Sequence, residues 1–277
     1  MTQSPRVTLA TGVDMPQLGF GLYKVPPEDA AQLVGDALAA GYRSLDTAAM
    51  YGNEAGVGRA VAEAADGGLP REDIFVTTKL WNSDHGYDAA LRAFDRSLSA
   101  LGLEYVDLYL IHWPCPTRGL FVETYRALER LLEEGRVRAI GVSNFLPGHL
   151  RRLAAECTLM PAVNQVELHP WLQQDLLKAV HADLGIRTEA WSPLGRGRIL
   201  EDPVIVEIAD AHHVTPAQAV IRWHLQCGHI VIPKASSPER IRENADVFGF
   251  ELTVDDLDRI AGLDRGERTG SDPDRVN

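Results

Sequence analysis

The chain has 277 residues, 45% of them hydrophobic and 24% charged, and these ordinary globular proportions exclude a disordered, collagen-like or coiled-coil chain. The formal net charge of −12 argues against nucleic acid and anionic membrane surfaces as partners, because both attract clustered positive charge. The length suits one α/β barrel of roughly 250 residues, so we expect a single domain over residues 1–277.

Short β-branched or apolar runs alternate with helical patterns along the chain. These runs have the length of strands, and most of them end in a polar residue. The first of them is short and rich in glycine. The predicted strands cover residues 18–21, 43–46, 74–79, 106–112, 139–143, 162–165, 186–191 and 229–233.

The helical patterns between these runs carry recognisable start and stop signals. The helix predicted over 28–40 follows two prolines and stops at a glycine. The helix predicted over 123–134 has apolar residues three and four apart and also stops at a glycine. Thr215 and Ser237 each precede a proline, which predicts that they are the N-caps of two later helices.

The alternation of strands and helices predicts a parallel sheet with right-handed crossovers. Asp46, Lys79 and His112 end successive strands at intervals of 33 residues, and Ser143 follows 31 residues later, which is the length of one βα unit. About eight such strands fit a closed (β/α)8 TIM barrel. The alternative, an open doubly wound sheet, usually carries GxGxxG after its first strand, and the chain contains no GxGxxG.

The two ends of the chain fall outside these predicted strands. Residues 3–15 include the turn residues Thr11 and Gly12 and predict an N-terminal hairpin that plugs the bottom of the barrel. After Asp264 the sequence becomes polar and loses its periodicity. We expect this C-terminal tail to lie over the active face.

Four polar side chains are expected to meet at the mouth of the barrel, where the C-terminal ends of the strands carry the chemistry. Asp46, Lys79 and His112 end consecutive strands, and Tyr51 lies in the loop after Asp46. Taken singly, each has a plainer explanation, such as a helix cap, a surface lysine, a buried histidine or a loop anchor. Together they are complementary, because Asp46 can neutralise a buried Lys79, and a lysine beside a phenol lowers the pKa of Tyr51.

The chemistry of this set favours carbonyl reduction. A phenol tuned in this way can act as a general acid, and a neutral His112 can donate a hydrogen bond that orients a carbonyl oxygen. The set contains no nucleophile beside a base and no metal triad. Carbonyl reduction fits it, provided that a hydride donor is present. A barrel enzyme that forms a Schiff base on Lys79 is an alternative.

These residues lie in the stretches LDTAAMYGNE, VTTKLWN and DLYLIHWP, and they resemble the catalytic tetrad of aldo-keto reductases. The resemblance continues in family order over nearly the whole chain through GVSNF, PAVNQVELHP, WSPLGRG and IPKASSPERIREN. Within the family, GFGLYKVPPED and YGNEAGVG are similar to bacterial 2,5-diketo-D-gluconic acid reductases and prostaglandin F synthase-like reductases.

The resemblance implies a barrel that binds NADPH extended across its mouth, with NADH as a weaker alternative. It assigns the nicotinamide carboxamide to Ser143, Asn144 and Gln165, and the nicotinamide ring to Trp191, whose aromatic face suits a planar ring. It assigns the pyrophosphate to Ser192, Leu194 and Gly195. It assigns the ribose 2′-phosphate to Lys234, Ser236, Ser237 and Arg240, and the adenine to Glu243 and Asn244.

The match is incomplete around the 2′-phosphate. Ala235 stands where relatives often have Ser, and Ser237 stands where the most similar relatives have Arg. Lys234 and Arg240 remain, and cations at this spot favour a phosphorylated ribose. We therefore expect a preference for NADPH that is smaller than in relatives with all three cations.

The resemblance also implies a substrate pocket lined by Tyr23, Trp81, His112, Trp113 and Asn144, with parts of the tail. The plainer alternative for Trp81 and Trp113 is that they are core aromatics. We expect a small carbonyl compound as substrate and no metal.

Location and assembly are expected from weaker signals. The three cysteines are widely separated without CxxC, and the N-terminus has no apolar core of a secretory signal, which predicts a cytoplasmic protein. We expect a monomer. An alternative to an enzyme is a regulatory subunit similar to the reductase-fold β subunits of potassium channels, which would bind NADPH and turn over slowly.

Overall fold

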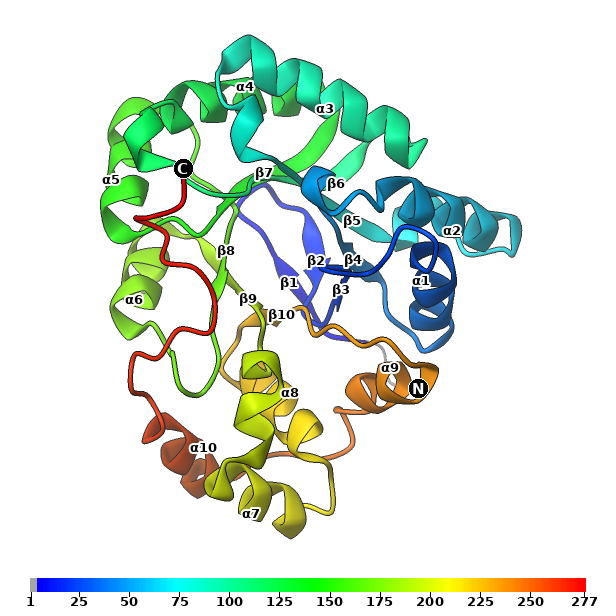
Figure 1. The fold of residues 1–277 in the computed structure, drawn as a ribbon, viewed down its shortest axis with the longest axis vertical. Helices are drawn as coiled ribbons and strands as arrows, with labels where there is room; N and C mark the ends of the chain where they lie inside the picture. Colours follow the sequence, from blue (N-terminus) through cyan, green and yellow to red (C-terminus); the bar gives the residue numbers. More distant parts are fainter. Residues whose placement is uncertain (1–3) are drawn as a thin grey trace.

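A computed structural model describes residues 4–277, so Gln3, the first residue of the predicted hairpin, lies outside the described residues. Eight parallel strands form one sheet whose order in space follows the chain, and helices surround this ring of strands (Figure 1). The strands are β3 (Phe20–Gly21), β4 (Ser44–Asp46), β5 (Phe75–Leu80), β6 (Val106–Ile111), β7 (Val137–Ser143), β8 (Val163–Glu167), β9 (Arg187–Trp191) and β10 (Ile230–Val231).

The first and last strands of this sheet meet and close it into a barrel. Leu18, just before β3, forms a parallel bridge with Val231 of β10. The amide N–H of Gly19 donates to the Val231 carbonyl at 2.9 Å, and that of Val231 donates to the Gln17 carbonyl at 2.8 Å. The prediction of a (β/α)8 barrel is therefore confirmed, and the open doubly wound alternative is wrong, because an open sheet leaves both edge strands unpaired.

Helices follow the strands, and the two predicted caps are confirmed. The Thr215 hydroxyl accepts from the amide of Gln218 at 3.3 Å, and the Ser237 hydroxyl accepts from the amide of Arg240 at 3.4 Å. The α-helices are α1 (Ala30–Ala39), α2 (Glu54–Asp66), α3 (Tyr87–Leu101), α4 (Phe121–Glu133), α5 (Pro147–Glu156), α6 (Asp175–Leu184), α7 (Pro203–Ala211), α8 (Pro216–Gln226), α9 (Pro238–Ala245) and α10 (Val254–Ala261). Short 3-10 helices are η1 (Ala49–Tyr51), η2 (Arg71–Asp73), η3 (Asn82–Asp84), η4 (Pro116–Arg118) and η5 (Gly195–Glu201).

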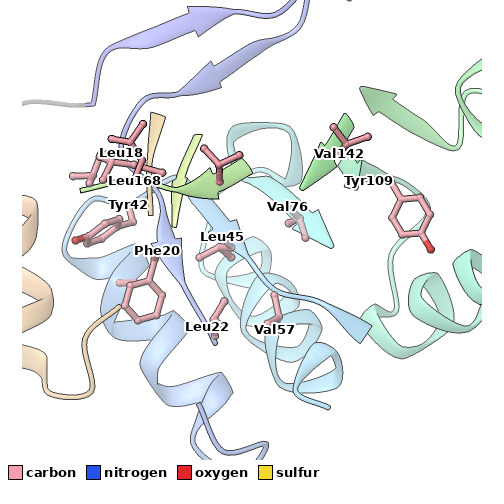
Figure 2. Close-up of a cluster of buried hydrophobic side chains, with 14 of the residues drawn as sticks. Leu18, Phe20, Leu22, Tyr42, Leu45, Val57, Val76, Tyr109, Val142 and Leu168 are labelled. Carbon is pink, nitrogen blue, oxygen red and sulfur yellow. The ribbon is translucent and has the colours of Figure 1, made fainter. Parts of the chain in front are cut away.

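Apolar side chains fill the layer between the strands and the helices. Figure 2 shows part of this core, with Leu45 of β4 and Val57 of α2, both fully buried. Burial of a side chain of this size contributes about 1.5–3 kcal/mol. Gly58 allows α2 and α3 to approach closely, because a Cβ at this position would collide with the carbonyl oxygen of Leu101.

An N-terminal hairpin closes one end of the barrel. Strands β1 (Arg6–Thr8) and β2 (Asp14–Pro16) pair in antiparallel register and lie across the centre of the ring in Figure 1. Leu9 and Met15 of the hairpin join a buried cluster with Phe75, Leu108 and Ile230 from the barrel strands. The predicted hairpin plug is confirmed over the residues that the structure describes.

The C-terminal tail runs over the opposite end of the barrel. After α10 it has no regular structure, and it passes β8 and β9 (Figure 1, red). The amides of Thr269 and Gly270 donate to the carboxylate of Glu167, the last residue of β8, at 2.6 and 3.0 Å. The predicted placement of the tail over the active face is confirmed. Within residues 4–277, no helix is long and apolar enough to cross a membrane.

Candidate active site

The C-terminal ends of three neighbouring strands bring together the residues predicted from the 33-residue spacing. Asp46 is the last residue of β4, Lys79 is the penultimate residue of β5, and His112 directly follows β6. Since β4, β5 and β6 pair side by side in parallel, their ends share one edge of the barrel. Tyr51 ends the 3-10 helix η1, which returns the chain over the same edge.

Lys79 is the centre of this group and is completely buried. Its Nζ donates to Asp46 Oδ1 at 2.6 Å, to the Thr47 carbonyl at 3.0 Å and to Tyr51 OH at 3.4 Å. These three acceptors use all three hydrogens of an ammonium group. Burial pulls the pKa of Lys79 down, but the Asp46 carboxylate and Tyr51 outweigh it, so its pKa lies above the ordinary value. Lys79 is therefore a fixed cation.

The pKa of Tyr51 differs from the expectation drawn from the sequence. Burial raises the pKa of Tyr51 to about 12, and the nearby Lys79 ammonium lowers it only in part. The expected direction of the Lys79 effect is correct, but the expected net lowering is wrong, because the sequence gives no measure of desolvation. Tyr51 is consequently a neutral phenol at ordinary pH, with a proton to donate and a cation beside its oxygen.

His112 is held in its neutral form. Burial and the charge of Lys79 lower the pKa of His112 well below its usual range. Its Nδ1 is buried and has no hydrogen-bond partner among the described residues. The imidazole centroid lies 5.6 Å from the ring of Tyr51 and 5.2 Å from the ring of Trp81. A neutral imidazole beside the phenol is suited to orient a polar group that meets Tyr51.

Three aromatic residues predicted for the substrate pocket, Tyr23, Trp81 and Trp113, lie around the rings of Tyr51 and His112. The Tyr23 ring centroid lies 5.2 Å from that of Tyr51, and Trp113 stacks on His112 at 6.5 Å. Tyr23 is 44% exposed, and Trp81 and Trp113 are partly exposed. The alternative of core aromatics for Trp81 and Trp113 is wrong, since neither ring belongs to the buried core.

The residues predicted for the nicotinamide form a connected network at the ends of β7, β8 and β9. The Ser143 hydroxyl donates to the Gln165 carbonyl at 2.8 Å. Asn144 Nδ2 donates to the His112 carbonyl at 3.0 Å, and Asn144 Oδ1 accepts from Trp191 Nε1 at 2.9 Å. The Trp191 ring is thereby fixed in orientation while it remains partly exposed.

Two buried carboxyl groups in this region, those of Glu189 and Glu167, were not predicted from the sequence. Gln165 Nε2 donates to Asp46 Oδ2 at 2.8 Å and to Glu189 Oε2 at 2.9 Å. Burial, reinforced by the Asp46 charge, raises the pKa of Glu189 to about 8. Glu167 holds the tail, and Gly270 of that tail lies against the Trp191 ring so closely that a Cβ would collide with it. A signal for Glu189 was available, because it shares a strand face with Trp191 two residues later.

The residues predicted for the pyrophosphate follow β9 in a tight loop. Ser192 has a φ of 48° and Gly195 a φ of 53°, both in the left-handed region. Leu194 precedes Gly195 and is partly buried. The loop begins at the residue after Trp191, so its backbone starts at the same edge of the barrel as the indole.

The residues predicted for the ribose phosphate and the adenine follow β10, which pairs with β9. Lys234 is exposed, and its Nζ donates to Ser236 Oγ at 2.6 Å. Ser237 caps α9, and the exposed Arg240 lies in the first turn of that helix. Further along α9, Glu243 accepts from the Thr215 hydroxyl at 2.8 Å, and Asn244 is buried.

Within residues 4–277, no group of three or more His, Cys, Asp or Glu side chains could hold a metal ion. The charged centre of the site is the Lys79 ammonium.

Comparison with known proteins gives consistent matches over nearly the full length. The family model described as "Aldo/keto reductase family" matches residues 17–265. An aldo-keto reductase of Mycolicibacterium smegmatis is 57% identical over 99% of this chain and 98% of its own length. The glyoxal reductase of Bacillus subtilis is 47% identical over 98% of this chain and 96% of its own length. The crystal structure of a Gox0644 mutant in complex with NADPH has a TM-score of 0.95 and 47% identity, covering 100% of both chains.

Proposed function

The chain belongs to the aldo/keto reductase family, and on that premise we propose that it reduces aldehydes and ketones to alcohols with NADPH. One observation carries this proposal. The buried Lys79 ammonium is held between the Asp46 carboxylate at 2.6 Å and the Tyr51 hydroxyl at 3.4 Å. Burial keeps the proton on Tyr51, and the Lys79 ammonium stabilises the negative charge that remains after the proton is given away.

In the proposed reaction the chain supplies the proton and the orientation. NADPH, when bound, supplies the hydride for the carbonyl carbon. Tyr51 gives its phenolic proton to the carbonyl oxygen, and Lys79, paired with Asp46, stabilises the resulting phenolate. His112, which is neutral, donates a hydrogen bond that holds the carbonyl oxygen near Tyr51. The products are an alcohol and the oxidised cofactor.

The residues around the mouth fit the chemistry of NADPH. Trp191 offers a partly exposed aromatic face for the nicotinamide ring, and Ser143, Asn144 and Gln165 offer polar groups for its carboxamide. Exposed Lys234 and Arg240 lie beside the N-terminus of α9, where a phosphate dianion is favoured by charge and by the helix. The full set proposed for the pyrophosphate, the ribose phosphate and the adenine is Ser192, Leu194, Gly195, Lys234, Ser236, Ser237, Arg240, Glu243 and Asn244.

The proposed substrate is a small carbonyl compound such as a dicarbonyl or a diketo sugar acid. Tyr23, Trp81 and Trp113, with His112 and Asn144, line the pocket in this proposal, and their partly exposed rings suit a compact substrate. The Bacillus subtilis relative at 47% identity acts on glyoxal by its name. The finer similarity to 2,5-diketo-D-gluconic acid reductases stays a prediction, as do the single domain and the monomer.

Two alternatives are disfavoured by the same geometry. A Schiff base needs a neutral, free amine, whereas all three hydrogens of Lys79 Nζ have acceptors and its pKa is raised. A regulatory subunit with little turnover needs no proton donor, whereas the Tyr51 phenol is held beside a fixed cation.

The test is NADPH oxidation measured against a panel of keto acids, diketones, methylglyoxal and aromatic aldehydes. We expect turnover with several members of the panel. NADPH binding without turnover of any of them would favour the regulatory subunit. Irreversible attachment of a carbonyl compound to Lys79, after borohydride reduces the imine between them to a secondary amine, would favour the Schiff-base enzyme.

A further inference from the structure

The side-chain amide of Gln165 is fixed by two buried carboxyl groups. Its Nε2 carries two hydrogens, and the two acceptors are Asp46 Oδ2 at 2.8 Å and Glu189 Oε2 at 2.9 Å. Both donor positions are therefore occupied. The other end of the amide, Oε1, accepts no hydrogen bond from the described residues, and it is not among their enclosed unpartnered atoms. Oε1 is the end of the amide that is open to a ligand.

We propose that Glu189 is a positioning residue: with Asp46 it turns the Gln165 amide so that its carbonyl oxygen, and not its NH2 group, meets the cofactor. Gln165 then accepts a hydrogen bond from the NH2 of the nicotinamide carboxamide. This inference rests on the proposed use of NADPH. It adds a role for a residue that touches neither substrate nor cofactor.

Glu189 is placed for this role by the strand register. Gln165 of β8 and Glu189 of β9 are direct partners across the parallel pair. Asp46 alone would hold only one N–H of the amide, and the terminal torsion of a glutamine side chain is broad and roughly two-fold. A second acceptor from an adjacent strand removes that freedom. An amide turned the other way would place Oε1 against the Asp46 carboxylate, which pairs with Lys79 at 2.6 Å.

Burial of the Glu189 carboxyl costs free energy of folding, which a positioning role would account for. Its side chain is buried with 0% exposure, and its Oε1 has no hydrogen-bond partner among residues 4–277. A buried polar group without a full set of partners is destabilising, and an apolar side chain would avoid that cost. Burial and the neighbouring Asp46 raise the pKa of Glu189, and its Oε2 accepts from Gln165 Nε2 at 2.9 Å. The orientation that this carboxyl group imposes on the Gln165 amide explains its presence at a buried position.

The experiment compares two cofactors that differ only at the carboxamide. We would measure dissociation constants of NADP⁺ and of its 3-acetylpyridine analogue, whose acetyl group has no N–H to donate. The unmodified protein should prefer NADP⁺ by about tenfold, the size of one well-placed hydrogen bond. In Glu189→Leu this preference should fall to about twofold or less, because the amide is free to turn. Glu189→Gln, which keeps an oxygen acceptor, should retain the preference.

A purely structural role for Glu189 would weaken both cofactors equally and leave their ratio unchanged. Full preference in a folded Glu189→Leu protein therefore overturns the proposal, as does the lack of any preference in the unmodified protein. Glu189→Met, which also lacks an oxygen, takes the place of the Leu variant should that variant not unfold cooperatively.

Adenosine 2′,5′-bisphosphate, which has no nicotinamide, should bind all variants alike. Its failure to bind the unmodified protein would instead overturn the proposed use of NADPH.

Discussion

Two lysines at the mouth of the barrel differ in how many partners the protein itself provides. Lys79, at the end of β5, is fully buried and has three oxygen acceptors within 3.4 Å. Lys234, after β10, is exposed, and within residues 4–277 it donates only to the neighbouring Ser236 hydroxyl. The polar groups around Lys79 are held in place before any ligand arrives, whereas Lys234 and the exposed Arg240 have most of their hydrogen-bonding capacity left.

The difference separates two kinds of function within one site. A group fixed in a dry environment contributes most to a developing charge, because it does not have to reorganise during the reaction. Exposed cations are screened by salt and attract a ligand without fixing the chemistry. Substitutions around Lys79 should therefore affect turnover and stability, and substitutions around Lys234 should affect only the binding and choice of cofactor.

The largest effect is expected at Tyr51. Tyr51→Phe keeps the ring and removes the proton, so turnover should fall by about 10²–10⁴-fold, the usual contribution of a general acid. NADPH affinity should change little, because the phenol gives its proton to the substrate. Steady-state rates and a separate binding titration check both parts. Near-normal turnover in this variant would remove Tyr51 from the proposed reaction.

Lys79→Met should abolish most activity and also destabilise the fold. It leaves the Asp46 carboxylate buried without its cation, and breaking a buried pair costs about 3–5 kcal/mol. Urea denaturation measures this loss. Lys234→Met is the matched control, and it should leave the free energy of unfolding within about 0.5 kcal/mol because Lys234 is exposed. Equal stability losses in the two variants would contradict the distinction between the two regions.

The same distinction explains what the sequence predicted and what it did not. The spacing of Asp46, Lys79 and His112 predicted their meeting, because parallel strands of a barrel end at one edge whatever their loops contain. The contact between Glu167 and Thr269 spans 102 residues and leaves no periodic trace in the sequence.

The net pKa of Tyr51 could not be predicted from the sequence, for a different reason. Desolvation depends on how completely neighbouring elements enclose a group, and the sequence does not specify that enclosure. The lengths of β3 and β10 were overestimated, because the glycines and the proline near them reduce regular pairing.

The pH dependence of stability should report on the buried carboxyl of Glu189. Its pKa is raised by burial from 4.5 to about 8, so between these values the folded protein holds a proton that the unfolded chain has lost. The free energy of unfolding should fall as pH rises from about 5 to 8, by at most about 1.4 kcal/mol per unit from this group. Glu189→Gln should make this slope shallower. An unchanged slope would mean that Glu189 does not titrate in this range.

Arg240→Ala should change the choice of cofactor without changing the fold. Loss of one charge-assisted hydrogen bond corresponds to about 1.5–3 kcal/mol, so the Michaelis constant for NADPH should rise by roughly tenfold or more. NADH lacks the 2′-phosphate, and its constant should stay within about twofold by the same argument. Added salt should weaken NADPH binding in the unmodified protein more than in the variant. Equal effects on both cofactors would place the phosphate elsewhere.

The smallest expected effect is a change in tryptophan fluorescence, and it concerns Trp191. The indole is held by Asn144 on one side, lies against Gly270 on another, and remains partly exposed. A nicotinamide stacked on it should quench part of the tryptophan emission of the protein. Trp191→Phe should remove most of this quench, although four tryptophans remain.

Trp171→Phe is the matched control for this fluorescence measurement, because Trp171 is 7% exposed and the guanidinium groups of Arg198 and Arg265 lie 5.4 and 3.9 Å from its ring centroid. It should lower the emission and leave the NADPH-induced quench in place. A quench that survives in Trp191→Phe and disappears in Trp171→Phe would move the nicotinamide away from β9. The Gln165 amide would then have no carboxamide to meet, so this measurement also tests the premise on which the role of Glu189 depends.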